Sequence, residues 1–467
     1  MKTRHVLPIV VAGTMALAGC FFEEDDPKKS SVRVIHASSD APPVDVRLGR
    51  DREIEGLDYK EGVLFTPNVG SSQMSINADL PGSQRETILT STYSFRQDRK
   101  YDFFVVGNVS NESIKPIVLT DDLETEAGDQ TRVRVVHLSP DAQAAARNVD
   151  VYLSDADDEL DEWLAAGPNF RMGYEDVEGP VLVSAGRYRV RVTLAGTATV
   201  VFESGPLSFL SGDDLLIAAV DNTAVDNVAG SGSQSPISLL VADGPEVNEV
   251  YDINQRSGVR VVHVARINES ISAFVDGELT IASVPFGKTG PSSERNAYAT
   301  VPPGTQDVAI NDSTGEISIA MVNPIVGEGK TIIAYDFKDS KGQIKSLVVN
   351  DLVRSVSTQA SLRIFHGSRV AALAGPVNIY LLPEDQTSVS GAVPILRDVP
   401  FGTESGYLAV EQENYNLFIR DADGNVRIGP VRVGLRDGGV YTFVATDSAA
   451  GDRTLLFQLD DNTDPLP

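Results

Sequence analysis

Four histidines recur at the end of one short phrase, and they are the residues best suited to chemistry in this chain. The phrase reads Val-Arg-Val-Ile-His, Val-Arg-Val-Val-His twice and Leu-Arg-Ile-Phe-His, and it ends at His36, His137, His263 and His366. Histidine can act as a general base, a metal ligand or a pH sensor, because its ordinary pKa lies close to neutrality. The one other histidine is His5. Each repeat therefore offers a single imidazole.

The residues around these histidines argue against metal binding and catalysis. A zinc site needs three or four ligands, whereas each repeat supplies one histidine and no thiolate. Ser139, His137 and Asp141 can be drawn as a catalytic triad, but three residues in one turn rarely align for proton transfer. The chain also lacks a G-x-S-x-G nucleophile motif. We expect no catalytic residues, no metal and no cofactor, and we expect that the protein is not an enzyme.

A structural role for the histidines is the simpler interpretation. In a strand, residues two apart share a face, so Val32, Val34 and His36 point the same way. The sequence predicts a histidine at the strand end that packs at the rim of a core. We expect the following turn to hold its ring through Asp40 in the first repeat or Asp141 in the second.

Two acidic stretches carry the oxygen ligands that calcium prefers. They are residues 155–159 with Asp161 and Glu162, and residues 421–425. Neither completes an EF-hand, so a solvated loop and a hairpin tip are the simpler interpretations, and calcium remains open. Sugars are often bound by stacking on exposed aromatic rings, and the chain has one tryptophan, Trp163. Glycan binding is therefore less favoured but stays open.

The spacing of the phrase defines the architecture. The histidines are 101, 126 and 103 residues apart, so the repeating unit has the size of a domain. A turn-like phrase follows each histidine, at residues 67–70, 168–170, 284–287 and 399–402. Between these landmarks run alternating segments such as 187–192 and 415–419, which are typical of half-buried strands. The best helical candidate is a short insertion at 157–166. We predict an all-β protein of four tandem immunoglobulin-like antiparallel β-sandwich domains.

The repeats also resemble a known family. Residues 133–142 read Val-Arg-Val-Val-His-Leu-Ser-Pro-Asp-Ala and are followed by Val-Asp-Val-Tyr-Leu at 149–153. Residues 32–48 and 362–381 follow the same plan, whereas the third repeat diverges at 264–267. This pattern resembles the bacterial and archaeal domain of unknown function 4397. The resemblance covers nearly the whole chain after the N-terminus and implies a secreted or lipid-anchored β-sandwich repeat protein with no established activity.

The N-terminus predicts export and lipid anchoring. A short basic start precedes an apolar run that is too short to span a bilayer, and the run ends Leu-Ala-Gly before Cys20, the one cysteine. We interpret residues 1–19 as a lipoprotein signal peptide, Cys20 as the lipid attachment site and 20–31 as a polar tether. Phe21 in place of an aspartate after the cysteine favours the outer membrane, facing either the periplasm or the exterior.

Composition limits the partners. The 467 residues are 42% hydrophobic, which excludes a disordered chain, and the net charge of −27 disfavours nucleic acid and anionic lipid surfaces. The predicted sandwiches occupy residues 32–121, 131–243, 258–353 and 360–462. The joints fall near 121–130, 243–258 and 353–360, and the acidic stretch 121–126 is typical of a flexible linker.

These observations favour a cell-envelope lipoprotein whose non-catalytic repeats form a stalk or display surface. Its expected partners are the membrane, through the lipid, and an envelope protein or glycan. The alternative is a lipoprotein that binds a small molecule, glycan or cation in its loops or between its domains.

Overall fold

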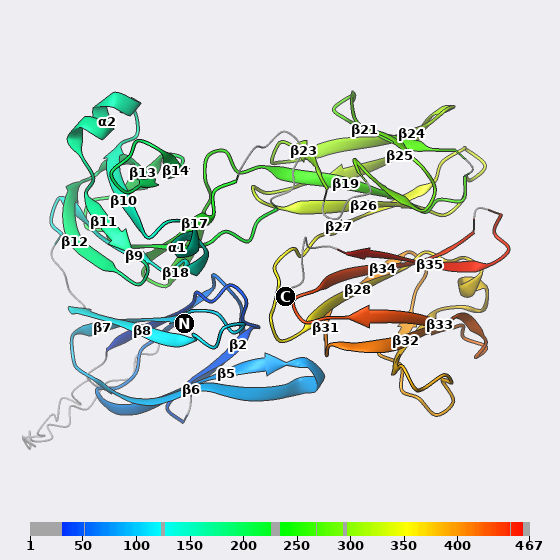
Figure 1. The fold of residues 1–467 in the computed structure, drawn as a ribbon, viewed down its shortest axis with the longest axis horizontal. Coiled ribbons are helices and arrows are strands. Elements are labelled where there is room, and N and C mark those ends of the chain that lie inside the picture. The colour runs from blue at the N-terminus through cyan, green and yellow to red at the C-terminus, as the bar shows by residue number, and fades with distance from the viewer. Residues whose placement is uncertain are drawn as a thin grey trace, which may run out of the picture.

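Four β-sandwiches make up the protein, and they occupy the four corners of the molecule in Figure 1. The structure is a computed structural model that describes residues 30–50, 52–122, 127–225, 234–267, 269–292, 297–448 and 450–460. Over these residues the chain forms eight sheets, two in each sandwich. The predicted all-β fold of four tandem sandwiches is confirmed.

Each sandwich has an inner sheet, which contains the recurring phrase, and an outer sheet. In the first sandwich the inner sheet consists of β1 (Ser31–His36), β4 (Gly62–Phe65), β7 (Arg99–Val106) and β8 (Lys115–Asp122). Its outer sheet consists of β2 (Val44–Leu48), β3 (Arg52–Leu57), β5 (Gly70–Leu80) and β6 (Gln84–Phe95), with the turn η1 (Pro81–Ser83) between β5 and β6.

The second sandwich is the largest. Its inner sheet consists of β9 (Gln130–His137), β12 (Val177–Ser184), β16 (Asp214–Asp221), β17 (Ile237–Asp243) and β18 (Glu246–Val250). Its outer sheet consists of β10 (Asn148–Asp155), β11 (Phe170–Gly173), β13 (Gly186–Leu194), β14 (Val200–Glu203) and β15 (Leu207–Phe209). Two short helices accompany it, α1 (Pro140–Ala145) and α2 (Leu160–Ala166), and α2 confirms the helix predicted within 157–166.

The third and fourth sandwiches follow the same plan. The third has the inner strands β19 (Ser257–His263), β22 (Lys288–Gly290), β23 (Ala299–Val301), β26 (Gly329–Tyr335) and β27 (Lys345–Asn350), and the outer strands β20 (Ile271–Val275), β21 (Glu278–Val284), β24 (Gln306–Asp312) and β25 (Gly315–Val322). The fourth has the inner strands β28 (Ala360–His366), β31 (Thr403–Val410), β34 (Val440–Asp447) and β35 (Thr454–Asp460), the outer strands β29 (Val377–Pro383), β30 (Leu396–Val399), β32 (Glu413–Arg420) and β33 (Val426–Leu435), and the turn η2 (Ala371–Ala374).

The strand that carries the phrase lies in the middle of each inner sheet. β1 pairs antiparallel with β4 on one side and parallel with β7 on the other, where His36 stands opposite Val105. The same parallel pairing joins β9 to β16, β19 to β26 and β28 to β34. A strand in this position has its backbone hydrogen bonds satisfied on both edges, which suits a run of buried apolar residues.

The inner sheets of consecutive sandwiches pack face to face. Ile35 and Phe104 of the first sandwich share one apolar cluster with Val136 and Leu216 of the second. A matching cluster joins the third and fourth sandwiches. The phrase strand is therefore buried on both faces: Val34 faces the core of its own sandwich, and its neighbour Ile35 faces the next sandwich. The four sandwiches thus form two pairs, which we call the first pair and the second pair (Figure 1).

Segments between the sandwiches tie the two pairs together. The backbone N–H of Val225 in the first pair donates to the carbonyl of Gly327 in the second at 3.0 Å. Arg354, between the third and fourth sandwiches, reaches back to the first sandwich, where its Nη1 donates to the carbonyls of Ser39 at 3.1 Å and Ala41 at 2.8 Å. The contacts of Arg354 connect segments more than 300 residues apart in the chain and help to hold the corners of the molecule together.

Candidate functional sites

Each recurring histidine ends the central strand of its inner sheet and lies edge-on against one aromatic ring. The ring centroids are 6.2 Å apart for His36 and Tyr59, 6.2 Å for His137 and Tyr174, 5.9 Å for His263 and Phe286, and 6.0 Å for His366 and Phe401. The angles between ring planes, 79° to 88°, make all four contacts edge-to-face, the arrangement that aromatic quadrupoles favour. We call each such pair a histidine clasp.

The backbone closes every clasp in the same way. The residue after the aromatic ring donates its N–H to the histidine carbonyl at 2.7 to 2.8 Å, and its φ lies between 69° and 79°. These four residues are Lys60, Glu175, Gly287 and Gly402. In the third and fourth repeats the clasp turn is the predicted turn phrase. In the first two it is not, and the predicted equivalence of 67–70 and 168–170 is wrong. What recurs is a left-handed backbone, which Lys60 and Glu175 adopt without being glycine.

The rings of His36, His137 and His263 bond to the backbone rather than to a carboxylate. Nε2 of His36 lies 3.1 Å from the carbonyl oxygen of Pro42, and Nδ1 accepts from the N–H of Ser38 at 3.3 Å. Asp40 accepts instead from the N–H groups of Val109 and Ser110. The expectation that Asp40 or Asp141 holds the ring is wrong, because the ring partners of His36 and His137 are backbone groups and Asp40 binds the loop after β7 instead.

Burial keeps the clasp histidines neutral. Desolvation lowers the pKa of His36, His137 and His366 to about 4 and lowers the pKa of His263 as well. Both ring nitrogens of His366 are buried without a hydrogen-bond partner among the residues that the structure describes. A neutral imidazole at a closed strand end is poorly placed to exchange protons with a substrate.

The triad that can be drawn from Ser139, His137 and Asp141 is not assembled. Oγ of Ser139 donates to Asp221 at 2.5 Å and accepts from the N–H of Ala142, which makes Ser139 the N-cap of α1. Burial, reinforced by the charge of Asp141, raises the pKa of Asp221 to about 6. This end-of-strand aspartate was missed by sequence reasoning.

The fourth sandwich repeats the arrangement. Oγ of Ser368 donates to Asp447 at 2.5 Å and accepts from the N–H of Ala371, and Asp447 also accepts from the N–H of Arg369. The signal available in the sequence is an aspartate that ends a mainly apolar strand, Asp221 in β16 and Asp447 in β34. These serines and aspartates close the turn after the clasp.

The arginine of the phrase was also missed, although it recurs in every copy. It points to the face between paired sandwiches: Nε of Arg33 pairs with Asp102 at 2.8 Å, and Nη1 donates to the carbonyl of Gly244 in the second sandwich at 2.9 Å. In the second pair, Asp351 receives both phrase arginines, with Arg260 at 3.3 Å and Arg363 at 2.7 Å. The recurring arginine thus forms buried ion pairs at the face between paired sandwiches, with an aspartate of its own sandwich at Arg33 and of the neighbouring one at Arg134 and Arg363.

The two acidic stretches are used locally. Glu159 and Glu162 form a reciprocal capping box at the start of α2, and Asp155 accepts from the N–H of Asp157. Asp421 accepts from the N–H of Asn425 at 2.8 Å and pairs with Arg427 at 2.6 Å. The second stretch forms the predicted hairpin tip between β32 and β33. Among the described residues, neither stretch brings three carboxylates close enough together to hold one metal ion.

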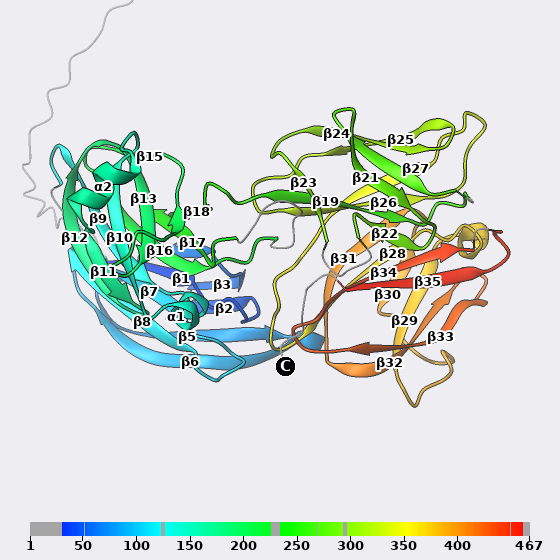
Figure 2. The ribbon, with the colours of Figure 1, turned by 45° about the horizontal axis from the view of Figure 1, so that its top comes forward.

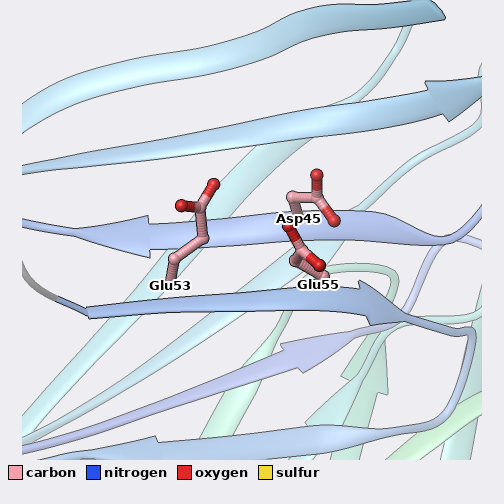
Figure 3. Close-up of side chains that lie close together, drawn as sticks. All are labelled: Asp45, Glu53 and Glu55. Atoms are coloured by element: carbon pink, nitrogen blue, oxygen red, sulfur yellow. The ribbon is translucent and has the colours of Figure 1, made fainter. Parts of the chain in front are cut away.

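Another acidic cluster does form, on the outer sheet of the first sandwich. Asp45 of β2 lies beside Glu53 and Glu55 of β3, with one carboxylate oxygen from each within 4.8 Å of the others (Figure 3). Arg85 of β6 sits against this cluster, 2.9 Å from Asp45 and 3.3 Å from Glu55, and it also lies 3.6 Å from Asp79. The chain therefore supplies its own cation here.

An open groove lies between the two pairs. It has a volume of about 770 Å³ and is lined by the segment 249–257, the loop 300–303 and Ile325 with Val326. Its walls are mainly apolar, and Ile253 and Ile325 are 46% and 61% exposed. Volumes of this order accommodate small ligands. The second sandwich also contains a small apolar cavity of about 30 Å³ beside His137.

Several predicted features lie outside the described residues. They include the signal peptide 1–19, Cys20, nearly all of the tether 20–31 and residues 123–126 of the acidic linker. The described part of that linker is ordered by ion pairs, since Asp121 at the end of β8 binds Arg132 at 2.7 Å and also binds Arg134. Among the described helices, none has the length and apolar character needed to cross a membrane.

One family model matches the chain. The family described as "Domain of unknown function (DUF4397)" matches residues 30–152 and 257–380, which together make up more than half of the chain. Each match runs from the phrase strand of one sandwich into the outer sheet of the next, from β1 to β10 and from β19 to β29. The matched unit thus crosses the face-to-face contact within a pair. No curated protein matches the chain.

Proposed function

The chain belongs to the DUF4397 family, and from this premise we propose that it is a cell-envelope lipoprotein whose paired sandwiches act as a non-catalytic scaffold for display or adhesion. One observation carries the proposal. The residues that recur, histidine and arginine, are closed into clasps and into ion pairs at the face between paired sandwiches. Repetition here serves packing rather than an open site.

The histidines provide the test against a catalytic or metal-binding role. Replacing all four clasp histidines by glutamine is expected to lower the melting temperature, while binding of the purified chain to isolated envelope fractions and to Zn²⁺ stays unchanged. A variant that keeps its stability but loses envelope or metal binding would contradict the scaffold proposal. Circular dichroism at the assay temperature verifies that the variant is folded.

Anchoring through Cys20 is part of the same proposal. The apolar run that ends Leu-Ala-Gly before this cysteine supports export and lipidation, and Phe21 supports sorting to the outer membrane. In cells fed a radiolabelled fatty acid, the chain should carry the label and fractionate with outer membranes. The variant Cys20→Ser should lose both properties, and the variant Ser30→Ala controls for a change near the start of β1. Retention of the label in Cys20→Ser contradicts the anchor.

Ligand binding is a second candidate function, and the groove between the two pairs favours it. The apolar walls at Ile253, Ile325 and Pro302 border Arg256, whose guanidinium makes no hydrogen bond or ion pair with the described residues. This combination suits an apolar molecule with an anionic end. The fluorescent anion 1-anilinonaphthalene-8-sulfonate should bind there, and Ile253→Ser with Ile325→Ser should weaken its binding about tenfold. Arg436→Gln, an exposed arginine elsewhere, serves as the charge control for Arg256→Gln.

A further inference from the structure

The outer sheets differ in how they are covered. The second strand of every repeat carries one residue at the same outward position, in Val-Asp-Val-Arg-Leu, Val-Asp-Val-Tyr-Leu, Ile-Ser-Ala-Phe-Val and Val-Asn-Ile-Tyr-Leu. These outward residues are Arg47, Tyr152, Phe274 and Tyr380. Three of the four are aromatic, and they point away from the core of their own sandwich.

In the second and fourth sandwiches an insertion covers this aromatic residue. Tyr152 is only 5% exposed, because Trp163 of α2 packs on it with ring centroids 4.7 Å apart. Tyr380 is 6% exposed and clusters with Phe418 and with Val389 of the loop between β29 and β30. Both insertions leave the chain at the same place, after the strand that carries the tyrosine.

The third sandwich lacks such an insertion. Only Asp276 and Gly277 separate β20 from β21, so no insertion covers Phe274, which is half-buried rather than nearly fully buried like Tyr152 and Tyr380. Register places Phe274 opposite Leu279 on one side and Ala309 on the other, and Ala309 opposite Ile319. Leu279, Ile319 and the adjacent Met321 are 57%, 56% and 68% exposed. We call Phe274, Leu279, Ala309, Ile319 and Met321 the bare face; it belongs to the outermost layer of the third sandwich (Figure 2).

The size of the bare face limits its occupant. Five side chains on four strands spaced about 4.8 Å apart offer on the order of 400 Å² of apolar surface. A stable dimer needs about 800 Å² from each partner. A second copy of the chain would also bring a net charge of −27 toward an equal charge. Both arguments favour a single short segment, comparable to α2, over another sandwich.

The rim of the bare face determines the charge of that segment. Asp276, Glu278 and Asp307 are exposed, and none of them forms an ion pair with the residues that the structure describes. We propose that the bare face docks one short amphipathic segment of another protein, with an aromatic side chain over Phe274 and basic residues toward the three carboxylates. This inference rests on the display role proposed above and specifies the chemistry of its partner.

The probe is a labelled peptide based on the natural cover of the second sandwich. Residues 158–167 read Asp-Glu-Leu-Asp-Glu-Trp-Leu-Ala-Ala-Gly, and the probe Lys-Lys-Leu-Lys-Lys-Trp-Leu-Ala-Ala-Gly keeps their apolar positions with the opposite charge. Fluorescence anisotropy with the purified chain should show saturable binding. The probe with alanine in place of tryptophan and the acidic parent sequence should bind at least tenfold more weakly.

Two protein variants separate the apolar and the charged contributions. Leu279→Ser with Ile319→Ser and Met321→Ser should weaken probe binding at least tenfold. Asp276→Asn with Glu278→Gln and Asp307→Asn should weaken it about fivefold and reduce its dependence on salt. All six positions are exposed, so the fold is retained, and circular dichroism verifies this. The matched control is Leu373→Ser with Val393→Ser, which removes exposed apolar residues of the fourth sandwich and should leave binding unchanged.

Three results would overturn the proposal. They are the absence of saturable binding, equal binding by the apolar variant, and sedimentation of the chain as a dimer that the apolar variant dissociates. The last result would show that a second copy covers the face. The assay uses the purified chain without lipid or envelope. A negative result therefore overturns the docking proposal and leaves the proposed anchor and scaffold untouched. The anchor and the scaffold are tested separately by the Cys20 and histidine variants.

Discussion

Two residues of the recurring phrase face opposite sides of one strand and meet different demands there. The arginine faces the neighbouring sandwich, where a charge is tolerated only with a partner such as Asp102 or Asp351. The histidine faces its own sandwich and ends the strand, where its ring fills the rim and its carbonyl receives the clasp turn. A purely apolar residue could fill the rim equally well. Histidine should therefore contribute most to stability where its ring nitrogens have hydrogen-bond partners.

The clasp histidines differ in their hydrogen bonds, so replacing each by methionine should change the free energy of unfolding by different amounts. His366→Met removes a ring whose two nitrogens are buried without partners in the described part of the chain, so the free energy of unfolding at pH 7 should stay the same or rise. His36→Met also deletes the bond to the carbonyl of Pro42 and leaves that oxygen buried, and it should cost about 1 to 3 kcal/mol. Urea unfolding of both variants measures the difference. Equal losses would contradict the assignment of distinct polar environments.

The lowered pKa values of the clasp histidines predict acid sensitivity. In the folded protein His36, His137 and His366 take up a proton only near pH 4, whereas in the unfolded chain they do so near 6.5. Between these values the unfolded state binds more protons, so stability falls as the pH drops, by about 1.4 kcal/mol per pH unit for each histidine. Asp221, whose pKa is raised to about 6, acts in the opposite sense between pH 6 and 4.

Unfolding measured from pH 7 to pH 4 tests this balance. The variant His366→Met should reduce the slope of stability against pH by the contribution of one proton, and Asp221→Asn should steepen it. An unchanged slope in His366→Met would mean that this imidazole is already protonated in the folded protein.

Asp351 gives the clearest test of the inter-sandwich ion pairs. Its side chain is fully buried, accepts from Arg363, Thr331 and Tyr298, and forms an ion pair with Arg260. Burial alone would raise its pKa, but the two guanidinium groups outweigh that effect and hold the pKa below its ordinary range. Asp351→Asn leaves two buried guanidinium groups short of a counter-charge and should cost about 3 to 5 kcal/mol in urea unfolding. Asp122→Asn breaks the exposed pair with Arg99 and should cost less than about 1 kcal/mol. Similar costs for the two variants would contradict the burial argument.

At the scale of elements, the clasp turn shows how one backbone geometry is reached by different residues. A left-handed φ costs an ordinary residue about 1 kcal/mol more than glycine. Gly287 and Gly402 avoid this cost, while Lys60 and Glu175 accept it. The crowding around the turn differs as well, because a Cβ at Gly402 would lie 2.6 Å from the hydroxyl of Tyr335.

Alanine substitutions separate backbone strain from crowding. Gly402→Ala adds both and should destabilise the chain by about 2 to 3 kcal/mol. Gly391 has nearly the same φ, 77°, and a Cβ added there would meet nothing within 4 Å, so Gly391→Ala should show the strain alone, about 1 kcal/mol. Thermal unfolding of both variants gives the two values. Equal costs would mean that Tyr335 moves aside freely.

The sequence predicted elements well and their contacts poorly. The recurring phrase, with its period and the alternating segments between its copies, was enough to predict four sandwiches. The pattern of residues 157–166 was enough to predict α2. The predicted equivalence of the four turn phrases was wrong in the first two repeats. There the left-handed residue of the clasp turn is Lys60 or Glu175 rather than glycine, so the residue type does not mark the turn. The role predicted for Asp40 was wrong and the role of Asp221 was missed, because their partners Val109 and Ser139 are distant in sequence and lie in turns. The Asp45 cluster depends on register between β2 and β3, which sequence spacing does not specify.

At the scale of the molecule, the unit of stability is a pair of sandwiches rather than one. Each inner sheet contributes one face to its own core and the other to its neighbour, as Ile35 and Phe104 do in the first pair. The family match follows this unit, since it crosses from β1 to β10 and from β19 to β29. Contacts of Arg354 and Val225 then join the pairs into one body. A shared apolar contact of this kind makes a single sandwich incomplete by itself.

The incompleteness of a single sandwich predicts how fragments behave. A fragment of residues 30–122 would expose Ile35, Phe104 and Val106, which are at most 1% exposed in the whole chain. It should bind a hydrophobic dye and aggregate. A fragment of residues 30–256 keeps the contact between the first two sandwiches and should unfold cooperatively as a soluble monomer. Phe104→Glu within the longer fragment places a charge in that contact and should reproduce the behaviour of the short fragment. A stable, dye-negative 30–122 would show instead that each sandwich folds alone, and the family match across the contact would then need another physical cause.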